Sequence, residues 1–367
     1  MDLKEFYSPA FYNNFSDVLT ETLPAFDKKK FIEMIFVPDW EQKALKERMR
    51  HTTTVLHHFL PKDFAAAANR IENIITCLRQ HKMLEQTKGI EFIFFPDYIE
   101  CYGLNDYETS VKSMEAITQF SSCEFAVRPF ILKYGSTMIR QMQQWSRHPH
   151  PAVRRLSSEG IRPRLPWAIA IPALKKDPAD ILPILENLKC DPDESVRRSV
   201  ANNLNDISKD HPDIVVKIAD KWKDSCKETD GIVKHGCRTL LKQGHPDILK
   251  LYTLIQSGLQ TINLKIHNRN VPIGQKLTFS FSIENENTEP QMIRLEYAIH
   301  YLLKNGQSSR KVFKISERIY QPREKAMITR QQNFRLITTR TFYPGQHGLT
   351  VIVNGQEKLS DHFNLTN

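Results

Sequence analysis

The spacing of apolar residues predicts helices over about the first 260 residues. In the segment 64–84, FAAAANRIENIITCLRQHKML, apolar side chains recur at three- and four-residue steps, as the buried stripe of a helix requires. The segment 110–134 shows the same spacing, and proline or Asp-Pro pairs separate such segments. This pattern is typical of a succession of amphipathic helices.

A repeat is visible from residue 151 onward. The segments PAVRRLSSEG (151–160), ESVRRSVANNL (194–204) and GIVKHGCRTLLKQG (231–244) align, and their valines lie 43 and then 37 residues apart. Paired helices with a period of about 40 residues indicate a HEAT-type solenoid. Stacking of the units would line the basic residues after each valine along one concave face. We expect phosphate contacts from Arg154, Arg155, Arg197, Arg198, Lys234 and Arg238; for any one unit, a solvated helix end is the alternative.

The pattern changes near residue 260, where apolar residues begin to alternate with polar ones. Turn signals separate the segments, including Lys304-Asn305-Gly306 and Asn354-Gly355. Six or seven short strands in these 107 residues predict an immunoglobulin-like β-sandwich, which lacks an inter-sheet disulfide because it has no cysteine. The expected strands are INLKIHN, KLTFSFSIEN, MIRLEYAIHYLL, KVFKISERIY, NFRLITTRTF and HGLTVIVNG.

The predicted fold class is therefore a multidomain α plus β protein. An all-α HEAT-like solenoid over residues 1–258 precedes a β-sandwich over residues 261–367. No apolar run approaches the roughly 20 residues of a membrane span, and the first residues lack the apolar core of a secretory signal. We expect a cytoplasmic protein that is a monomer and has no membrane partner.

The cysteines do not indicate a metal site. None of the six forms a CxxC pair or has a closely spaced pair of histidines beside it, so we expect buried, reduced thiols, no zinc and no organic cofactor.

The distribution of charge indicates an anionic partner. The net charge is +9, of which residues 261–367 contribute 15 basic and 8 acidic side chains, leaving 36 and 34 in the first 260 residues. Within that near-neutral part, Phe125–Lys176 contains ten Lys and Arg but only one carboxylate, Glu159. The chain thus has two basic regions, and one of them surrounds a single acid.

Glu159 lies in an unusual stretch, SSEGIRPRLPWA (157–168). Glycine and two prolines forbid one continuous helix, so the stretch predicts a helix end that carries Glu159 and a stiff Arg-Pro-Arg loop that presents Trp167. The alternatives are a simple helix-surface ion pair between Arg155 and Glu159, worth about 0.3–0.5 kcal/mol, and a core position for Trp167.

Around these residues the chain resembles a known family. HPHPAVRRLSSEGIRPRLPWA (148–168), together with segments 40–61, 121–131 and 196–212, is similar to the AlkC family of bacterial DNA alkylation-repair glycosylases. The resemblance implies a HEAT-like solenoid, in some members with a C-terminal immunoglobulin-like domain. It also implies removal of 3-methyladenine and 3-methylcytosine from DNA. Glu124, Glu159 and Trp167 match positions that form the catalytic cleft, and Arg155 and Arg162 match positions that flank it.

The chemistry is consistent with these residue types. A base methylated at N3 is cationic and leaves the sugar as a neutral molecule, so no general acid is needed. A carboxylate that stabilises the oxocarbenium-like sugar and aligns water is sufficient. The surrounding basic residues would hold the DNA backbone, and an indole would attract the cationic base by about 0.5–2 kcal/mol. The DNA-binding candidates in this region are Arg128, Arg147, His148, Arg154, Arg155, Arg162 and Arg164.

Two other functions remain open from the sequence. A HEAT scaffold can bind DNA or RNA without chemistry, and a protein–protein solenoid would have no affinity for DNA. For the basic β-sandwich we expect an accessory grip on duplex DNA, with a stabilising cap on the last helices as the alternative. The family resemblance also implies a lesion base that stays largely stacked rather than being flipped out, and a bacterial protein that is associated with the nucleoid through DNA binding.

Overall fold

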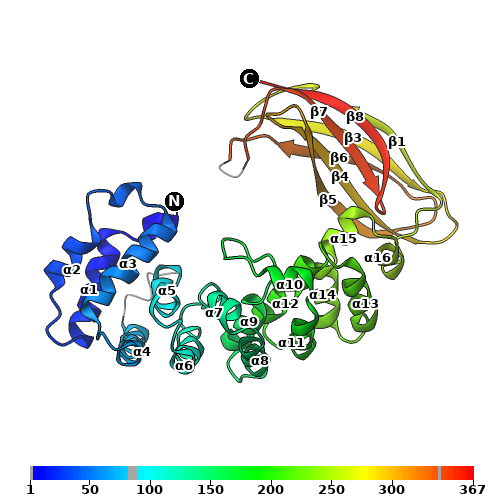
Figure 1. Cartoon of the computed structure of the whole chain (residues 1–367). Helices are drawn as coiled ribbons and strands as arrows, with labels where there is room; N and C mark the ends of the chain where they lie inside the picture. Colours follow the sequence, from blue (N-terminus) through cyan, green and yellow to red (C-terminus); the bar gives the residue numbers. More distant parts are fainter. Residues whose placement is uncertain (1–2, 82–88, 338–339) are drawn as a thin grey trace. The chain divides into compact units, whose positions relative to one another are not determined.

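The computed structural model describes residues 3–81, 89–337 and 340–367. The chain forms two compact units (Figure 1). Unit 1 comprises Met1–His211 and Trp222–Gly236, and unit 2 comprises Pro212–Lys221 and Cys237–Asn367. Helices therefore occur in both units, and the β-strands belong to unit 2.

Unit 1 consists of helices in two rows. The row that includes α3, α5, α9, α12 and α14 packs against the row that includes α4, α6, α8 and α11 (Figure 1). The helices are α1 (Pro9–Thr22), α2 (Lys28–Ile35), α3 (Leu45–Phe59), α4 (Phe64–Gln80), α5 (Phe94–Tyr102), α6 (Tyr107–Ile117), α7 (Val127–Tyr134), α8 (Ser136–Trp145), α9 (Pro151–Glu159), α10 (Pro172–Lys176), α11 (Leu182–Leu188), α12 (Glu194–Ile207) and α14 (Lys227–Gly236).

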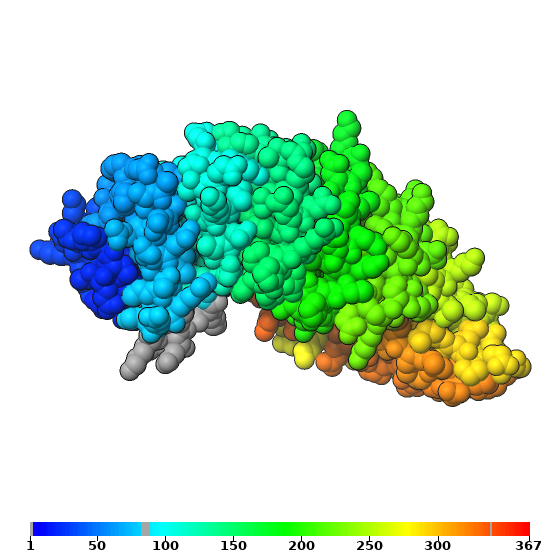
Figure 2. Space-filling view, turned by 90° about the horizontal axis from the view of Figure 1, so that it is seen from below, coloured from blue at the N-terminus to red at the C-terminus, as the bar shows by residue number. Residues whose placement is uncertain are grey.

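The repeat seen in the sequence corresponds to stacked helices α9, α12 and α14. Each of the first two begins at a side-chain cap: His150 accepts a hydrogen bond from an amide of α9, and Asp193 accepts two from α12. Their valines, Val153 and Val196, are fully buried. Helix α12 packs against both α9 and α14, and the segments of unit 1 follow one another in sequence order on the face in Figure 2. The prediction of a helical-repeat solenoid is confirmed.

Two helix predictions need correction. The segment 110–134 is not one helix, because α6 ends at Ile117 and α7 begins at Val127, with a turn between them that carries Glu124. The predicted helix over 64–84 is α4, which ends at Gln80, and its last three predicted residues lie outside the described residues.

Unit 2 contains three helices and a β-sandwich. One sheet has the strand order β1-β3-β6 and the other β2-β8-β7-β4-β5. The elements are α13 (Pro212–Trp222, whose last residue belongs to unit 1), α15 (Arg238–Gln243), α16 (Pro246–Leu251), β1 (Leu259–Ile266), β2 (Asn270–Pro272), β3 (Lys276–Asn285), β4 (Gln291–Leu302), β5 (Ser308–Tyr320), β6 (Lys325–Asn333), β7 (Gly345–Val353) and β8 (Gln356–Thr366).

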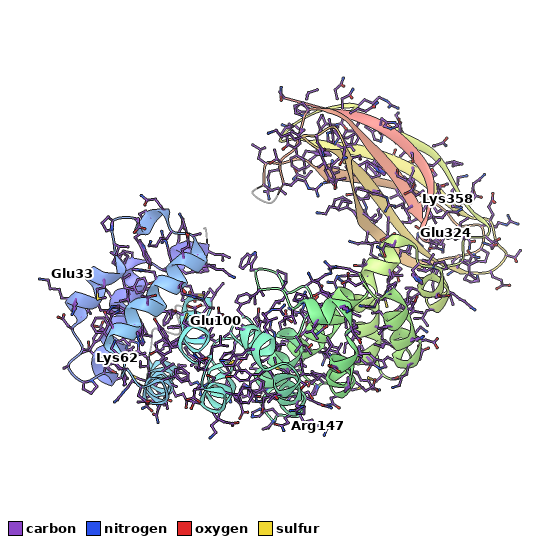
Figure 3. All side chains as sticks on the ribbon, in the orientation of Figure 1. Glu33, Lys62, Glu100, Arg147, Glu324 and Lys358 are labelled. Carbon is purple, nitrogen blue, oxygen red and sulfur yellow. The ribbon has the colours of Figure 1, made fainter. Side chains whose placement is uncertain are left out.

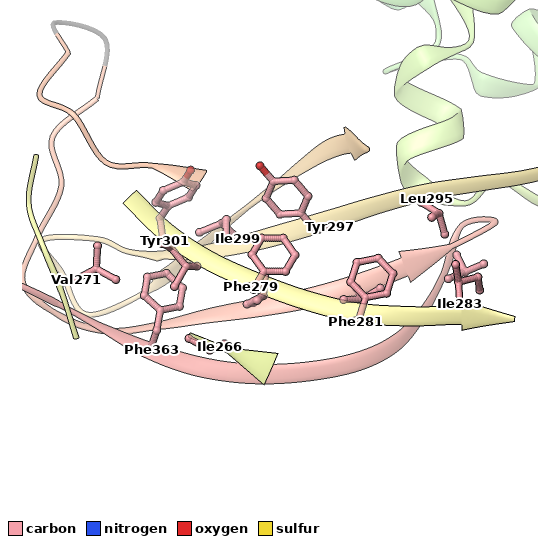
Figure 4. Packing of buried hydrophobic residues seen from close by; sticks show 14 of the residues in the cluster. Ile266, Val271, Phe279, Phe281, Ile283, Leu295, Tyr297, Ile299, Tyr301 and Phe363 are labelled. Atoms are coloured by element: carbon pink, nitrogen blue, oxygen red, sulfur yellow. The ribbon is translucent and has the colours of Figure 1, made fainter. Parts of the chain in front are cut away.

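The core of the sandwich is formed by alternate residues of facing strands. Phe279 and Phe281 of β3 lie between the sheets with Leu295, Tyr297 and Ile299 of β4 (Figure 4). The two predicted turns are confirmed, because residues 303–307 join β4 to β5 and Asn354-Gly355 joins β7 to β8. Both residues of the second turn have positive φ, which the primed hairpin turns require.

The strand prediction for the sandwich is correct in class but not in detail. The described residues contain eight strands rather than six or seven. NFRLITTRTF (333–342) is not a strand of its own: only its first residue, Asn333, belongs to β6, and residues 338–339 of this segment are outside the described residues. Strand β8 was missed because its polar residues obscure the alternation, since only Phe363 and Leu365 are buried there.

The cysteines are more exposed than the sequence suggested. All six thiols are free, and Cys123 and Cys237 are buried, but Cys190 is exposed and the other three are partly exposed. None of the described helices is both long and apolar enough to cross a membrane.

Gly160 tests the packing that ends α9. A Cβ added there would lie 2.5 Å from Val127 Cγ1 and 2.9 Å from Met142 Cε, whereas a Cβ on Gly231 in α14 would meet nothing within 4 Å. We expect Gly160→Ala to lower the free energy of unfolding by about 1–3 kcal/mol and Gly231→Ala to raise it by about 0.5–1 kcal/mol. Urea unfolding measures both, and equal shifts in the two variants would contradict the packing.

Candidate active site

The loop after α9 is held in place by Arg128. This residue of α7 has no exposed surface, and its guanidinium donates hydrogen bonds to the carbonyl oxygens of Gly160, Arg162 and Ile169 at 2.6–2.9 Å. Burial, together with Arg162, lowers the pKa of Arg128 to about 10, so it stays charged at neutral pH. The prediction that Arg128 contacts DNA phosphate is therefore corrected, because a fully buried guanidinium cannot reach one.

Glu159 is the last residue of α9 and is only 5 % exposed. Its Oε1 accepts a hydrogen bond from Arg162 Nη1 at 2.6 Å, and its Oε2 lies 4.0 Å from Arg155 Nη2. The helix-surface pair with Arg155 is thus the weaker of its two contacts. Oε2 has no hydrogen-bond partner among the described residues, so one oxygen of a buried carboxylate is fixed and the other remains available.

Arg162 is held in turn by a second buried acid. Its Nε donates to Asp206 Oδ2 at 2.9 Å, and Asp206, which is 2 % exposed, also pairs with Lys209 at 3.2 Å. Burial disfavours the charged guanidinium, but Glu159 and Asp206 outweigh this cost and raise the pKa of Arg162. Arg162 is therefore a fixed cation between two carboxylates.

Glu124 reaches the same group of charges from the turn before α7. Its Oε2 accepts hydrogen bonds from Arg155 Nη1 and Ser122 Oγ, both at 2.8 Å. Because Arg155 also faces Glu159, the two predicted carboxylates share one guanidinium. The result is an alternating series of charges that runs from Asp206 through Arg162, Glu159 and Arg155 to Glu124.

One cavity brings the predicted catalytic residues together. It has a volume of about 570 Å³, and Glu124, Glu159 and Trp167 all line it. Trp167 is 64 % exposed, which excludes the core position, and it has a φ of +65° that is uncommon for a bulky residue. The other lining residues are Leu45, Lys46, Met49, Gly89, Ile90, Ile93, Phe120, Ser121, Ser122, Phe125, Arg162, Leu165 and Pro166.

Lys46 of α3 closes one side of this cavity. Its ammonium lies 4.9 Å from the centre of the Phe125 ring and donates a hydrogen bond to the carbonyl oxygen of Trp167. A second hollow of about 480 Å³ shares Lys46, Met49 and Phe125 with the first and extends it toward Arg50. The two hollows are therefore neighbours that share an aromatic side chain, Phe125, and a basic side chain of α3, Lys46.

The first arginine of each of the first two repeats, Arg154 and Arg197, is held by contacts within the protein. Arg154 donates to the carbonyl oxygens five and six residues before it and forms a two-point contact with Asp191 at 2.6 and 3.0 Å. Arg197 makes the same pair of backbone contacts to Asp191 and Pro192. An arginine therefore recurs at this position because it caps the loop that precedes its helix. The phosphate contact that the sequence suggested for both residues stays a prediction.

The remaining predicted DNA contacts lie in several places. Arg164 pairs with Asp210 at 2.6 Å and exposed Arg198 with Glu194 at 2.6 Å. Arg147 is exposed, and Figure 3 shows it at the lower edge of unit 1, near the end of α8. His148 lies 3.6 Å from Glu115 and caps its own loop. Lys234 is exposed on α14, and Arg238, in unit 2, is partly exposed.

Sequence reasoning missed three residues of the site. Asp206 could have been found, because it is an acid on the buried stripe of a repeat helix, where an unpaired charge is not tolerated. Ser122 and Lys46 carry no such signal, since their role depends on the approach of separate helices. Among the described residues, no group of three or more His, Cys, Asp or Glu side chains is arranged to hold a metal ion.

The chain is similar to proteins of DNA repair. Residues 103–257 match the family model described as DNA alkylation repair enzyme, and residues 260–367 match the C-terminal Ig-like domain of the uncharacterised protein YhaZ. The uncharacterised protein YhaZ of Bacillus subtilis (strain 168) is 44% identical over 363 residues, which are 99% of each chain. The structure of the Pseudomonas fluorescens alkylpurine DNA glycosylase AlkC, bound to DNA that contains an abasic site analogue, is 32% identical, with a TM-score of 0.93 over 100% of both chains.

The repeat fold and the matched domain thus define a helical-repeat protein of the DNA alkylation-repair class with an Ig-like domain. Within that class, the chain belongs to the AlkC family.

The role of Arg128 can be separated from DNA binding. Arg128→Met would leave three buried carbonyl oxygens without their donor, so we expect a loss of about 3–5 kcal/mol in the free energy of unfolding. The control is Arg147→Met, an exposed position at which we expect a change within about 0.5 kcal/mol. Thermal unfolding measures both, and a stable Arg128→Met variant with weakened DNA binding would restore the phosphate role.

Proposed function

We propose that the chain is a monofunctional DNA glycosylase that hydrolyses the N-glycosidic bond of cationic 3-methyladenine and 3-methylcytosine in duplex DNA. The observation that carries this proposal is the geometry of Glu159. One of its oxygens is fixed by Arg162, and the other has no hydrogen-bond partner among the described residues, in a cavity that Trp167 and Glu124 also line.

The proposed reaction needs only charge stabilisation and an aligned water. The cationic base leaves as a neutral molecule, so the positive charge moves to the sugar as the bond breaks. Glu159 then stabilises the oxocarbenium-like sugar, and its Oε2 orients the attacking water. Glu124 assists as the second carboxylate of the cavity, while Ser122 and Arg155 hold it.

Arg162 and Asp206 are proposed to position Glu159. A buried carboxylate keeps its charge only when it is paired, and breaking a buried pair costs about 3–5 kcal/mol. If Arg162 were free to move, it would not hold the Glu159 carboxylate in a fixed orientation toward the developing sugar cation. Because Asp206 fixes the Nε edge of Arg162, the Nη1 edge presents Glu159 in one orientation.

Trp167 is proposed to lie against the deoxyribose or the cationic base of a lesion that stays largely stacked. Its exposed indole at the cavity wall supports contact with a nucleotide from outside, and a cation beside an indole is stabilised by about 0.5–2 kcal/mol. Hydrolysis would then not require the base to be flipped into a closed slot.

The DNA backbone is proposed to bind to basic residues of each unit. In unit 1 the exposed or partly exposed candidates are Lys46, Arg147, His148, Arg154, Arg155, Arg164, Arg197, Arg198 and Lys234. In unit 2 the charge of +7 over residues 261–367 and exposed basic side chains on β5 and β6 support an accessory grip. We propose that the protein acts as a monomer and needs no cofactor.

Glu159→Gln tests the catalytic role. The substitution keeps the size of the side chain but removes the charge that stabilises the sugar cation, so we expect release of 3-methyladenine to fall by at least about 10²-fold. Chromatography of free base from methylated duplex DNA measures the rate, and salt-titrated binding to the same duplex should change little.

Glu33→Gln is the matched control, because Glu33 is an exposed carboxylate of α2 that pairs with Lys29, outside the cavity. Its release rate should equal that of the unmodified chain. Normal release by Glu159→Gln would refute the assignment. Tight, salt-sensitive binding without release by the unmodified chain would instead favour a non-catalytic nucleic-acid scaffold.

Trp167→Ala tests the contact with the lesion. Loss of an attraction of about 0.5–2 kcal/mol corresponds to a decrease of about 2- to 30-fold in kcat/KM for the cationic base. Trp167→Phe should retain part of the rate, and thermal unfolding of both variants should be nearly unchanged because the side chain is exposed. A loss of stability that parallels the loss of activity would show that the indole has a structural role.

A further inference from the structure

Two thiols from neighbouring repeats lie in contact, away from the cavity described above. Cys190 follows α11, and Cys226 precedes the first residue of α14. Their sulfur atoms are 3.4 Å apart, although 35 residues separate them in the sequence. A disulfide requires about 2.0 Å, so the two sulfurs need to approach by only about 1.4 Å.

Thr229 links the two sulfurs. Its Oγ1 lies 3.1 Å from Cys190 Sγ and 2.9 Å from Cys226 Sγ, and it also donates to the carbonyl oxygen of Lys189 at 3.0 Å. The buried hydroxyl can turn its single proton toward either sulfur when that sulfur is charged. It therefore stabilises a thiolate at the point where the two repeats meet.

The first turn of α14 adds a second donor. The Thr229 backbone N–H points at Cys226 Sγ, 3.4 Å away, as in a helix N-cap. The side-chain hydrogen bond from Thr229, followed by its backbone N–H and by Cys190, lowers the pKa of the Cys226 thiol. By contrast, burial raises the pKa of Cys77, Cys101, Cys123 and Cys237.

Access distinguishes this pair as well. Cys190 is exposed and Cys226 is partly exposed, so a small oxidant in solution reaches both. We propose that Cys190 and Cys226 form a modification site, at which a hydroperoxide converts the two thiols into a reversible disulfide.

The reaction is a two-electron oxidation of the protein. The Cys226 thiolate attacks one oxygen of hydrogen peroxide, the O–O bond breaks, and hydroxide leaves, so that a sulfenic acid forms on Cys226. The Cys190 thiolate then attacks this sulfur and the S–O bond breaks. In sum, two thiols and one hydrogen peroxide give one disulfide and two waters.

The disulfide would fasten the loop after α11 to the first turn of α14. It closes a loop of the chain that contains α12, the helix that carries Asp206 and packs against α14. The cross-link restricts the unfolded chain, so the oxidised protein should unfold at a higher temperature. Neither cysteine lines the cavity that contains Glu159, so base release does not depend on the bond.

Peptide mapping of the full-length protein after hydrogen peroxide treatment tests the site. We expect a peptide that joins Cys190 to Cys226, with the mass of two hydrogen atoms lost, and a decrease of two in the number of maleimide-reactive thiols that dithiothreitol reverses. Tm should rise on oxidation and return on reduction. The control Cys77→Ser removes another partly exposed thiol and should leave the cross-link unchanged.

Cys190→Ser provides an independent measurement if the cross-link affects folding. Without its partner, oxidised Cys226 should remain a sulfenic acid, which dimedone labels at that residue. The proposal is overturned if peroxide leaves both thiols of the unmodified chain reactive, if it joins a different pair, or if dimedone labels another cysteine of Cys190→Ser in place of Cys226.

Discussion

The site depends on the ion pairs that hold Arg162 between Glu159 and Asp206. Both acids are buried, and burial of an unpaired carboxylate is so unfavourable that it would take up a proton instead. The guanidinium satisfies both with separate edges, at 2.6 and 2.9 Å, and thereby supports a charged carboxylate at Glu159. The proposed catalysis requires this charge, because a neutral acid would not stabilise a sugar cation.

The surrounding architecture serves to place this pair. Helix α9 ends at Glu159, Gly160 allows α7 and α8 to pack closely against that end, and Arg128 ties down the loop that follows. The loop then presents Trp167, in a backbone conformation that costs a bulky residue about 1–3 kcal/mol. Helix α12 brings Asp206 because it stacks on α9 in the next repeat. The repeat is therefore both the framework of unit 1 and the source of the second carboxylate.

The sequence predicted much of this arrangement, because local rules determine it. Helical spacing, the period of the repeat and the strand alternation gave both parts of the fold, and Gly-Pro chemistry ended the helix at Glu159. The isolation of that acid in a basic region pointed to the site. The sequence did not show which arginines are buried: Arg128 and Arg155 look alike in the chain, yet Arg128 is buried and holds a loop, whereas Arg155 is partly exposed and pairs with Glu124. Burial depends on packing between helices far apart in sequence, as do the positions of Lys46 and Asp206.

The same limit explains the errors in the β-sandwich and in the cysteines. Strand β8 has a polar exposed face, and its partner β7 determines its position. The contact between Cys190 and Cys226 arises only when two repeats stack. The central claim, that a charged, paired Glu159 hydrolyses the bond to a cationic base, is tested most directly by incubating the purified chain with methylated duplex DNA. The account predicts free 3-methyladenine and an alkali-sensitive abasic site without added metal, and DNA binding without any release of base would contradict it.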